Sequence, residues 1–504
     1  MWGVQLDPRL PVIVGVGQTS SKPSAWADDL PSPPSLMAAA LELAAIDSGA
    51  GERLLKAADS LQTVEAMSWR APDPAGFVAS LLGLSPRERV RTTTGGNSPQ
   101  TLVNQAASAI ASGSLDVVLI TGAEAMYSRR LAAKAGVDTG WPKQDESAVP
   151  SRVVGVAADQ PGTSEFEMKR SLVVPTQVYP VFECALRAEA GASVEEHQVR
   201  VSELWSRFSS VASTNPYAWS PSPLTAEEIR TVGPDNRMIG FPYPKLMNSN
   251  IQVDQAAALI VCSVEAARSA GVPEDRWVFV HSGADAHDHW FPSNRWSLGR
   301  SPAIAACGDL GLALAGIGVD DIAHLDLYSC FPSAVEVAAL ELGIDAWDPS
   351  RVPTVTGGLC FAGGPGNNYV THSIASMVDR LRSDAGSYGL VTANGWYLTK
   401  HALGIYSTTP PAAGFRWASG QDTVHASPSR DVAVDYSGPA VIEAYTVLHD
   451  RDGSPNLGIV ACLLADGRRT WANTTDPSCL HALTTEACEH RAVTIDRLGA
   501  LTSE

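Results

Sequence analysis

Residues 92–110, "TTTGGNSPQTLVNQAASAI", decide the fold class of this chain. A Thr-rich run meets a glycine pair, the chain turns, and a helix rich in small residues begins. A strand, a tight turn and a helix in this order present one residue at the mouth of the helix, as in enzymes that hold a nucleophile there. Ser98 is therefore either a nucleophile or, because Pro99 follows it, the N-cap of the helix.

The same arrangement recurs in the second half of the chain. "GGPGNNYVTHSIASMV" (363–378) is again a glycine pair that leads into a helix, and "YGLVTANGW" (388–396) follows it. In the first half, the apolar run "VVLITGAEA" (117–125) holds the matching place. Continuous apolar strands that alternate with helices are typical of α/β layers. The sequence therefore predicts two related α/β halves.

The remaining segments differ in composition. A segment rich in Pro, Ser and charge follows the first half, which indicates loops inserted over the active site. Strand-like runs separated by turns close the chain, which predicts a small β-barrel of the OB kind. The predicted domains are an N-terminal half (1–125), an insert (126–250), a C-terminal half (251–405), a linker (406–435) and a β unit (436–504).

Charge and cysteine usage narrow the class of protein. The net charge of −18 argues against a general role on nucleic acid or a membrane surface, and no apolar run approaches the ~20 residues that span a bilayer. The eight cysteines are scattered without a C-x-x-C pair, as expected for reduced thiols in the cytoplasm. "HSGADAHDHWF" (281–291) does not indicate a metal site, because adjacent residues on a strand point to opposite faces.

Three motifs, in order, resemble the thiolase superfamily. "GGNSPQTLVNQAASAIASGSLDVVLITGAEAM" (95–126) resembles the nucleophile segment and the strand after it. "HLDLYSCFPSAVEVAALELGI" (324–344) is similar to the segment that carries an Asn-Glu-Ala-Phe or His-Asp-Cys-Phe motif, and "TGGLCFAGGPGNN" (356–368) is similar to the Gly-His-Pro loop. The resemblance covers about residues 8–405 and is nearest to the sterol-carrier-protein-type thiolases, in the acetyl-CoA acetyltransferase class.

This resemblance implies a five-layered αβαβα fold, acyl-CoA chemistry and a dimer. Its catalytic positions, however, carry other residues here. The nucleophilic Cys falls on Asn97 or Ser98, and neither is a thiol. Gly364 stands where the family has a His base, and Asn394 or its neighbour stands where the family has a second Cys. Cys330 matches the Cys of the His-Asp-Cys-Phe variant.

Claisen condensation needs an acyl acceptor, a proton acceptor and an oxyanion site together. We therefore expect a protein that binds an acyl-CoA or a related lipid thioester without ordinary thiolase activity, and that requires no other cofactor. One alternative is an acyltransferase that uses Ser98 or Cys330 with His401 as the base. Another is a non-catalytic partner subunit, either a dimer or a monomer, that docks on a protein through its C-terminal domain.

Overall fold

The structure is a computed structural model that describes residues 6–23, 30–156 and 160–502. Within these residues an eleven-stranded mixed sheet runs in the order β10-β11-β12-β9-β1-β8-β4-β2-β3-β5, with β13 beside β9. Its strands in the first half are β1 (Pro11–Ser20), β2 (Ser60–Thr63), β3 (Glu88–Thr92), β4 (Val117–Ala125), β5 (Arg152–Val154) and β8 (Asp254–Ser263). Those in the second half are β9 (Val278–His287), β10 (Ile322–Asp326), β11 (Tyr388–Gly395), β12 (Lys400–Ser407) and β13 (Arg416–Ser419).

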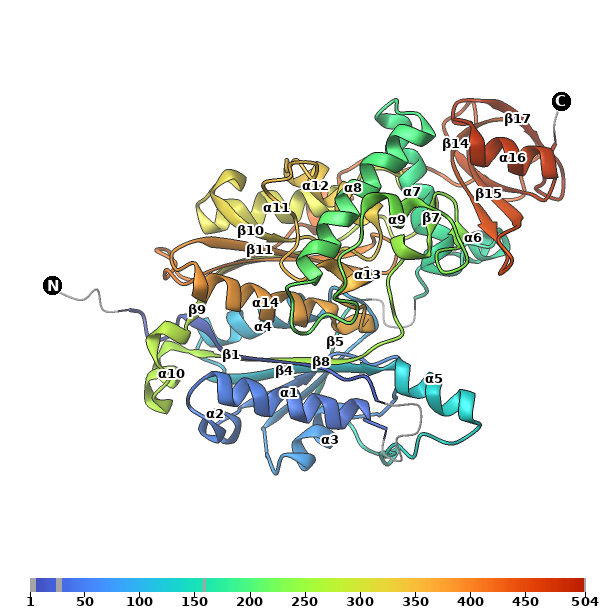
Figure 1. The fold of residues 1–504 in the computed structure, drawn as a ribbon. Helices are drawn as coiled ribbons and strands as arrows, with labels where there is room; N and C mark the ends of the chain where they lie inside the picture. The colour runs from blue at the N-terminus through green and yellow to red at the C-terminus, as the bar shows by residue number, and fades with distance from the viewer. Residues whose placement is uncertain (1–5, 24–29, 157–159, 503–504) are drawn as a thin grey trace.

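Helices cover both faces of each half of the sheet. Figure 1 shows α1 below the first half, α4 and α14 between the halves, and α11 and α12 above the second half. The outer helices are α1 (Pro33–Asp47), α2 (Glu52–Lys56), α3 (Pro74–Leu81), α10 (Val264–Ala270), α11 (Pro302–Ala315) and α12 (Pro332–Leu342). The inner ones are α4 (Ser98–Ala111), α13 (Gly358–Phe361) and α14 (Tyr369–Ser383). Sheets and helices therefore alternate in layers.

Alternating side chains explain why the central strands are apolar throughout. Every residue of β4 is buried. Val118 and Ile120 belong to the core that contains α4, whereas Leu119 belongs to the core that contains α1. Successive side chains of a strand point to opposite faces, so a strand between two helical layers needs apolar residues at each position.

The described residues of the predicted insert contain five α-helices, whereas the composition of the segment indicates loops. It contains α5 (Met126–Ala135), α6 (Glu165–Lys169), α7 (Pro175–Glu189), α8 (Val194–Ala212), α9 (Ala226–Arg230), β6 (Met238–Gly240) and β7 (Tyr243–Pro244). Ser193 and Glu196 form a capping box at the start of α8. Val201, Leu204 and Phe208 are buried on one side of that helix at helical spacing.

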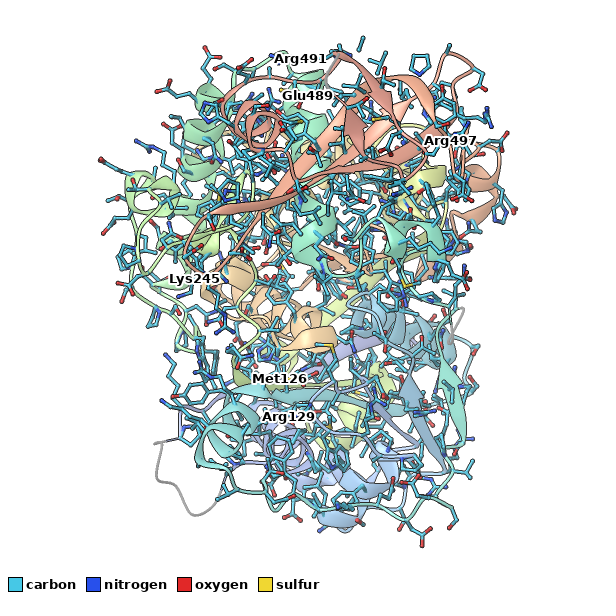
Figure 2. The ribbon with its side chains drawn as sticks, turned by 90° about the vertical axis from the view of Figure 1, so that its right-hand side faces the viewer. Met126, Arg129, Lys245, Glu489, Arg491 and Arg497 are labelled. Carbon is cyan, nitrogen blue, oxygen red and sulfur yellow. The ribbon has the colours of Figure 1, made fainter. Side chains whose placement is uncertain are left out.

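The C-terminal residues form a separate antiparallel sheet. Its elements are β14 (Gly438–His449), β15 (Pro455–Leu463), β16 (Arg469–Thr474), α16 (Pro477–Thr485), β17 (Ala492–Ile495) and β18 (Leu501–Thr502), preceded by α15 (Gln421–His425). The strand order is β16-β15-β14-β17-β18, and β6 of the insert pairs with β14. The segment predicted as a linker carries β13, which extends the main sheet by pairing with β9. Figure 2 shows Glu489, Arg491 and Arg497 on the C-terminal unit, far from Arg129 at the start of α5.

Buried arginines join the C-terminal sheet to the rest of the molecule. Arg469 is fully buried; it pairs with Glu443 at 2.6 Å and donates to the carbonyl oxygen of Ser293 at 2.9 Å. Arg187 of α7 pairs with Glu489, and both side chains are buried. Removing one partner of such a pair leaves a buried charge without compensation, so these contacts hold the sheet in one position.

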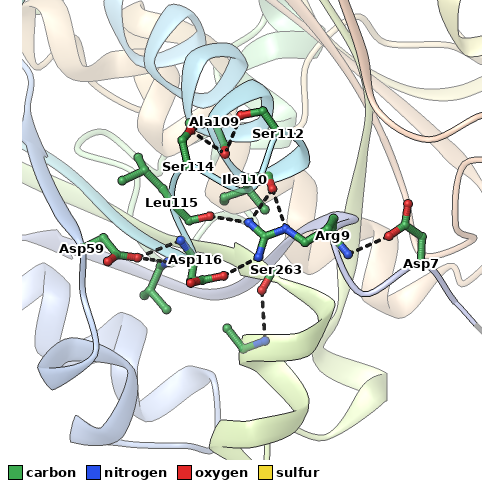
Figure 3. A network of polar contacts seen from close by, with 12 residues as sticks. Asp7, Arg9, Asp59, Ala109, Ile110, Ser112, Ser114, Leu115, Asp116 and Ser263 are labelled. Atoms are coloured by element: carbon green, nitrogen blue, oxygen red, sulfur yellow. Dashed lines mark hydrogen bonds and ion pairs between the residues drawn. The ribbon is translucent and has the colours of Figure 1, made fainter.

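Arg9 fixes the far end of α4. Its guanidinium donates to the carbonyl oxygens of Ile110 at 2.6 Å and Leu115 at 2.6 Å, and it pairs with Asp116 at 2.5 Å (Figure 3). The last carbonyls of a helix lack intrahelical partners and carry partial negative charge, which a cation there stabilises. The opposite end of α4, which carries residues 97 and 98, forms part of the site described below.

Candidate functional site

The start of α4 differs by one residue from the predicted N-cap. Asn97 is the N-cap, and Ser98 is the first helical residue. The Ser98 hydroxyl donates to the carbonyl oxygen of Thr93 at 3.2 Å, and the Asn97 amide donates to Thr101 Oγ1 at 3.4 Å. Neither side chain accepts a hydrogen bond from a helix N–H. Because Pro99 lies inside the first turn and lacks an N–H, the turn has one donor fewer to cap.

The segments that resemble the thiolase motifs meet at Gly96. A Cβ atom on Gly96 would lie 2.5 Å from the carbonyl oxygen of Asn394 and 2.5 Å from the Tyr328 hydroxyl. The neighbouring Gly95 donates its N–H to Asn367 Oδ1 at 3.0 Å. This hydrogen bond joins the loop after Gly364 to the start of α4. Only a glycine fits where three segments approach so closely. The fold therefore brings the four loops together, as the resemblance implies.

On the Cys330 side of this meeting point the space is filled. Asn394 Nδ2 donates to the Tyr179 hydroxyl at 2.8 Å and lies 4.0 Å from Cys330 Sγ. The Tyr179 ring stacks on Phe331 with 4.6 Å between centroids. Cys330 itself is 8% exposed. A void of about 10 Å³, room for about one water molecule, lies beside Tyr328 and Asn394, and Cys330 is not among its described lining residues. The side chains packed around Cys330 therefore leave little room for an acyl group.

Cys330 is a neutral thiol in this setting. Burial raises its pKa to about 12, although the Tyr179 hydroxyl and backbone N–H groups act in the opposite direction. The thiolate is the nucleophilic form of cysteine, and it is scarce at neutral pH when the pKa is so high.

Gly364 and His401 do not supply a base to Ser98. The backbone N–H of Gly364 donates to the carbonyl oxygen of Asn250 at 2.9 Å, and the residue has no side chain. His401 Nε2 lies 3.5 Å from Ser301 Oγ and 3.7 Å from Asp288 Oδ2. Ser301 is the N-cap of α11, so this edge of the imidazole faces that helix. In the described part of the chain, the Ser98 hydroxyl has only its own loop as a hydrogen-bond partner.

A cavity of about 230 Å³ opens on the other side of Asn97. The described residues that line it are Asn97, Thr101, Gln105, Gly155, Val156, Asp285, Ala286, His287, Lys400, His401 and Ser419. Asn97 and His401 were predicted as site residues, whereas Ser98, Cys330, Gly364 and Asn394 are not among the described lining residues. Sequence reasoning missed Lys400 and Asp285, and it considered the segment of His287 as a metal site, which it rejected.

Lys400 places an amine close to the mouth of α4. It stands opposite His287 in the antiparallel pairing of β12 with β9, so the two side chains leave the sheet on the same face. Its ammonium donates to the carbonyl oxygen of Thr94, and the residue is 3% exposed. Burial lowers the pKa of Lys400 to about 8. A large share of this amine is therefore neutral in mildly alkaline solution.

Asp285 forms the floor of the cavity and already has its donors. It accepts from Thr101 Oγ1 at 2.5 Å, Asn104 Nδ2 at 2.7 Å and Trp417 Nε1 at 2.7 Å. Burial raises its pKa despite these three hydrogen bonds. The contacts join α4, β9 and β13, so Asp285 holds the cavity wall together.

Two amide oxygens at the predicted catalytic positions have no partner among the described residues. They are Asn97 Oδ1 and Asn394 Oδ1, on side chains that are 8% and 4% exposed. Buried polar atoms are nearly always hydrogen-bonded, so an unpartnered acceptor beside a cavity suits a ligand that donates.

A second polar cluster lies away from this cavity. Glu183, His197 and Glu336 have atoms that all lie within 4.8 Å of one another, and these atom types also ligate metals. His197 and the Tyr243 hydroxyl both contact the Glu183 carboxylate. Burial, and then the charge of Glu183, raise the pKa of Glu336 well above its usual value. Because Glu336 is neutral and Glu183 is ionised, the two carboxyl groups carry one negative charge between them. The cluster therefore needs no metal ion to balance a second charge.

Comparisons with known proteins identify the family. Residues 420–499 match the family described as the thiolase-like protein type 1 additional C-terminal domain. A monomeric SCP2-thiolase-like protein type 1 from Mycobacterium smegmatis is 33% identical, covers 99% of this chain and 100% of its own, and superposes with a TM-score of 0.84. This chain belongs to the SCP2-thiolase-like protein type 1 family. The predicted thiolase fold and the additional C-terminal domain are thereby confirmed.

More distant similarities agree with the fold of this family. The dimeric peroxisomal thiolase of Saccharomyces cerevisiae is 14% identical with a TM-score of 0.56, over 80% of this chain and 98% of its own. An acetyl-CoA acetyltransferase of Methanocaldococcus jannaschii is 26% identical over 270 residues, which are 53% of this chain and 60% of that protein. The chain thus spans under two thirds of that relative. In the described residues, no helix is long and apolar enough to cross a membrane.

Proposed function

We propose that this SCP2-thiolase-like protein binds an acyl-CoA or a related lipid thioester in the cavity beside Asn97, and that it does not catalyse ordinary thiolase condensation or cleavage. One observation carries the proposal. The four loops meet as in an active thiolase, yet the groups they present are an amide, a neutral buried thiol and a glycine.

Each missing group removes one step of the thiolase reaction. The Asn97 amide cannot accept an acyl group from a thioester, and Gly364 cannot take a proton. Asn394 is hydrogen-bonded to Tyr179 and has no acidic proton to give. Cys330 remains, but it is packed against aromatic rings and stays protonated at neutral pH. Among the described residues, the four motif positions do not provide a nucleophile, a base and an acid together.

The cavity supports binding of the acyl end of a thioester. Its volume of about 230 Å³ is below the ~300–1,000 Å³ of sites that enclose a whole drug-sized ligand, so a nucleotide would stay outside. The unpartnered Asn97 Oδ1 can accept from an amide N–H of a pantetheine arm. Polar side chains line the walls, which suits a carbonyl-bearing acyl group better than a long alkyl chain.

Calorimetry and a thiolysis assay test the proposal together. We expect acetoacetyl-CoA to bind the full-length protein without being cleaved when free CoA is added. A Ser419→Trp variant, which fills the rim of the cavity, should lose binding, whereas Arg416→Trp on the same strand should retain it. Thiolysis at the rate of an active thiolase that survives Ser98→Ala would overturn the proposal. A covalent acyl adduct on Ser98 or Cys330, detected by mass spectrometry, would instead support an acyltransferase.

A further inference from the structure

We propose that Lys400 is a nucleophile whose amine condenses with a keto carbonyl in the cavity, so that the site performs imine chemistry on a β-dicarbonyl compound. The inference rests on the proposed function for the expected substrate, a 3-oxoacyl thioester. It does not depend on the thioester for the reactivity of the amine.

The amine lies where the family places its nucleophile. A Cβ atom on Gly95 would be 2.7 Å from Lys400 Nζ and 2.5 Å from Asn97 Oδ1, so both atoms lie close to the same point. The side chain reaches this point from β12 and is anchored by its hydrogen bond to the carbonyl oxygen of Thr94. A carbonyl group held beside Asn97 is therefore within reach of the amine.

The surroundings of Lys400 favour its neutral, nucleophilic form. In the described residues, no carboxylate lies within 4.0 Å of its Nζ, and the nearby Asp285 is already occupied by three donors. The positive end of the α4 dipole also lies on this side, which disfavours a second positive charge. The lowered pKa of about 8 agrees with this geometry. Desolvated lysines of this kind are the ones that form Schiff bases.

His287 is placed to move the protons. Its Nδ1 lies 3.0 Å from the carbonyl oxygen of Asp288, so Nδ1 carries the hydrogen and Nε2 is left as the basic atom. It is the cross-strand partner of Lys400 and lines the same cavity. The Trp290 ring, 5.6 Å from the imidazole centroid, limits its rotation.

The reaction balances without a further reactant. The lone pair of Lys400 Nζ forms a bond to the keto carbon, and the carbonyl π pair moves to oxygen. His287 takes one proton from nitrogen and returns it to that oxygen, which becomes a hydroxyl group. A second proton from His287 lets this hydroxyl leave as water while the nitrogen lone pair forms the C=N bond. The remaining amine proton then replaces that proton on His287. Amine and ketone give imine and water, with no oxidation or reduction. A protonated imine then accepts electrons from a neighbouring C–H or C–C bond.

Pentane-2,4-dione, a small β-diketone, tests the inference on the full-length protein. We expect one adduct, with the mass of the diketone less one water, on the peptide that contains Lys400. The conjugated product also gives a new near-ultraviolet absorbance. The rate of adduct formation should rise as pH increases through about 8, because the neutral amine is the reactant.

Matched variants separate chemistry from folding. Lys400→Met should abolish the adduct, whereas Lys134→Met, at an exposed lysine of α5, should leave it unchanged. His287→Gln should slow adduct formation by about 100-fold, a typical contribution of a positioned proton carrier. Thermal melts of each variant verify that it folds.

Adducts spread equally over surface lysines, or an adduct that persists in Lys400→Met, would overturn the inference. An unreactive Lys400 in a protein that still binds acetoacetyl-CoA would sink this inference and leave the proposed function standing. A reactive Lys400 in a protein that binds no thioester would support this inference and overturn the proposed function.

Discussion

The molecule has two sides around Gly96, a closed one toward Cys330 and an open one toward Lys400, and they differ in almost every physical respect. Toward Cys330, Asn394 donates to Tyr179, whose ring stacks on Phe331, and Cys330 is 8% exposed. Toward Lys400, on the other side of Asn97, lies a cavity of about 230 Å³ with polar walls. The closed side holds Cys330, which matches the Cys of the His-Asp-Cys-Phe variant. The open side holds an amine and an imidazole that do not correspond to the thiolase motifs.

This difference shows how a catalytic fold can keep its backbone and lose its original chemistry. Glycines at 95 and 96 still allow the loops to meet. Large aromatic side chains fill the space beside Cys330. Burial raises the pKa of the Cys330 thiol, which leaves it inert, and lowers the pKa of the Lys400 amine, which leaves it reactive.

Opening the closed side should have the largest effect on stability. Tyr179→Ala removes a fully buried ring that stacks on Phe331 and accepts from Asn394. We expect a loss of about 3–5 kcal/mol in the free energy of unfolding, measured by urea denaturation. Tyr179→Phe keeps the ring and should cost about 1–3 kcal/mol, because buried donors lose their acceptor. Equal losses in both variants would mean that the ring does not hold this side closed.

The buried amine on the open side should make stability depend on pH. The pKa of Lys400 falls from 10.5 to about 8 on folding, so its neutral form favours the native state. The neutral amine contributes to the free energy of unfolding above pH 10.5, and this contribution is lost as pH falls through about 8. Lys400→Met should therefore remove a rise of about 3 kcal/mol between pH 8 and 10. Parallel pH curves for the two proteins would contradict the account.

Arg9 tests whether the open side needs a rigid α4. Arg9→Met removes the hydrogen bonds and charge at the far end of the helix, shown in Figure 3. We expect a loss of about 2 kcal/mol in the free energy of unfolding, and weaker binding of acetoacetyl-CoA. Lys56→Met, at an exposed pair with Glu52, is the control and should change neither quantity appreciably. Unchanged stability of Arg9→Met would refute this role.

Of these substitutions, Ser98→Ala should have the smallest effect on stability. Its hydroxyl makes one hydrogen bond, to the carbonyl oxygen of Thr93. Ser98→Ala should cost about 1 kcal/mol of stability and leave the affinity for acetoacetyl-CoA unchanged in calorimetry. A large fall in affinity would place Ser98 on the ligand side of the loop, which its hydrogen bond opposes.

The repeated glycine–helix units predict the fold well, because close approach of backbone and buried strands both leave clear local patterns. The α8 helix was also predictable, since Ser193 and Glu196 form a recognisable capping box and Val201, Leu204 and Phe208 follow at helical spacing. The composition of the segment, rich in Pro, Ser and charge, instead favours loops.

The site was predictable only in part. Asn97 and Asn394 could be placed from the motifs, but Lys400 stands beside His287 through the pairing of β12 with β9, which is a tertiary contact. The packing of Tyr179 against Cys330 joins residues far apart in sequence, and no local pattern signals it.

The central claim is that the open side, and not the Cys330 side, receives the ligand. A crystal structure of the protein soaked with acetoacetyl-CoA tests it most directly. We expect electron density for the acyl end between Asn97 and Lys400, with Tyr179, Phe331 and Cys330 unmoved. Density for the acyl group against Cys330 Sγ, with the aromatic rings displaced, would contradict it.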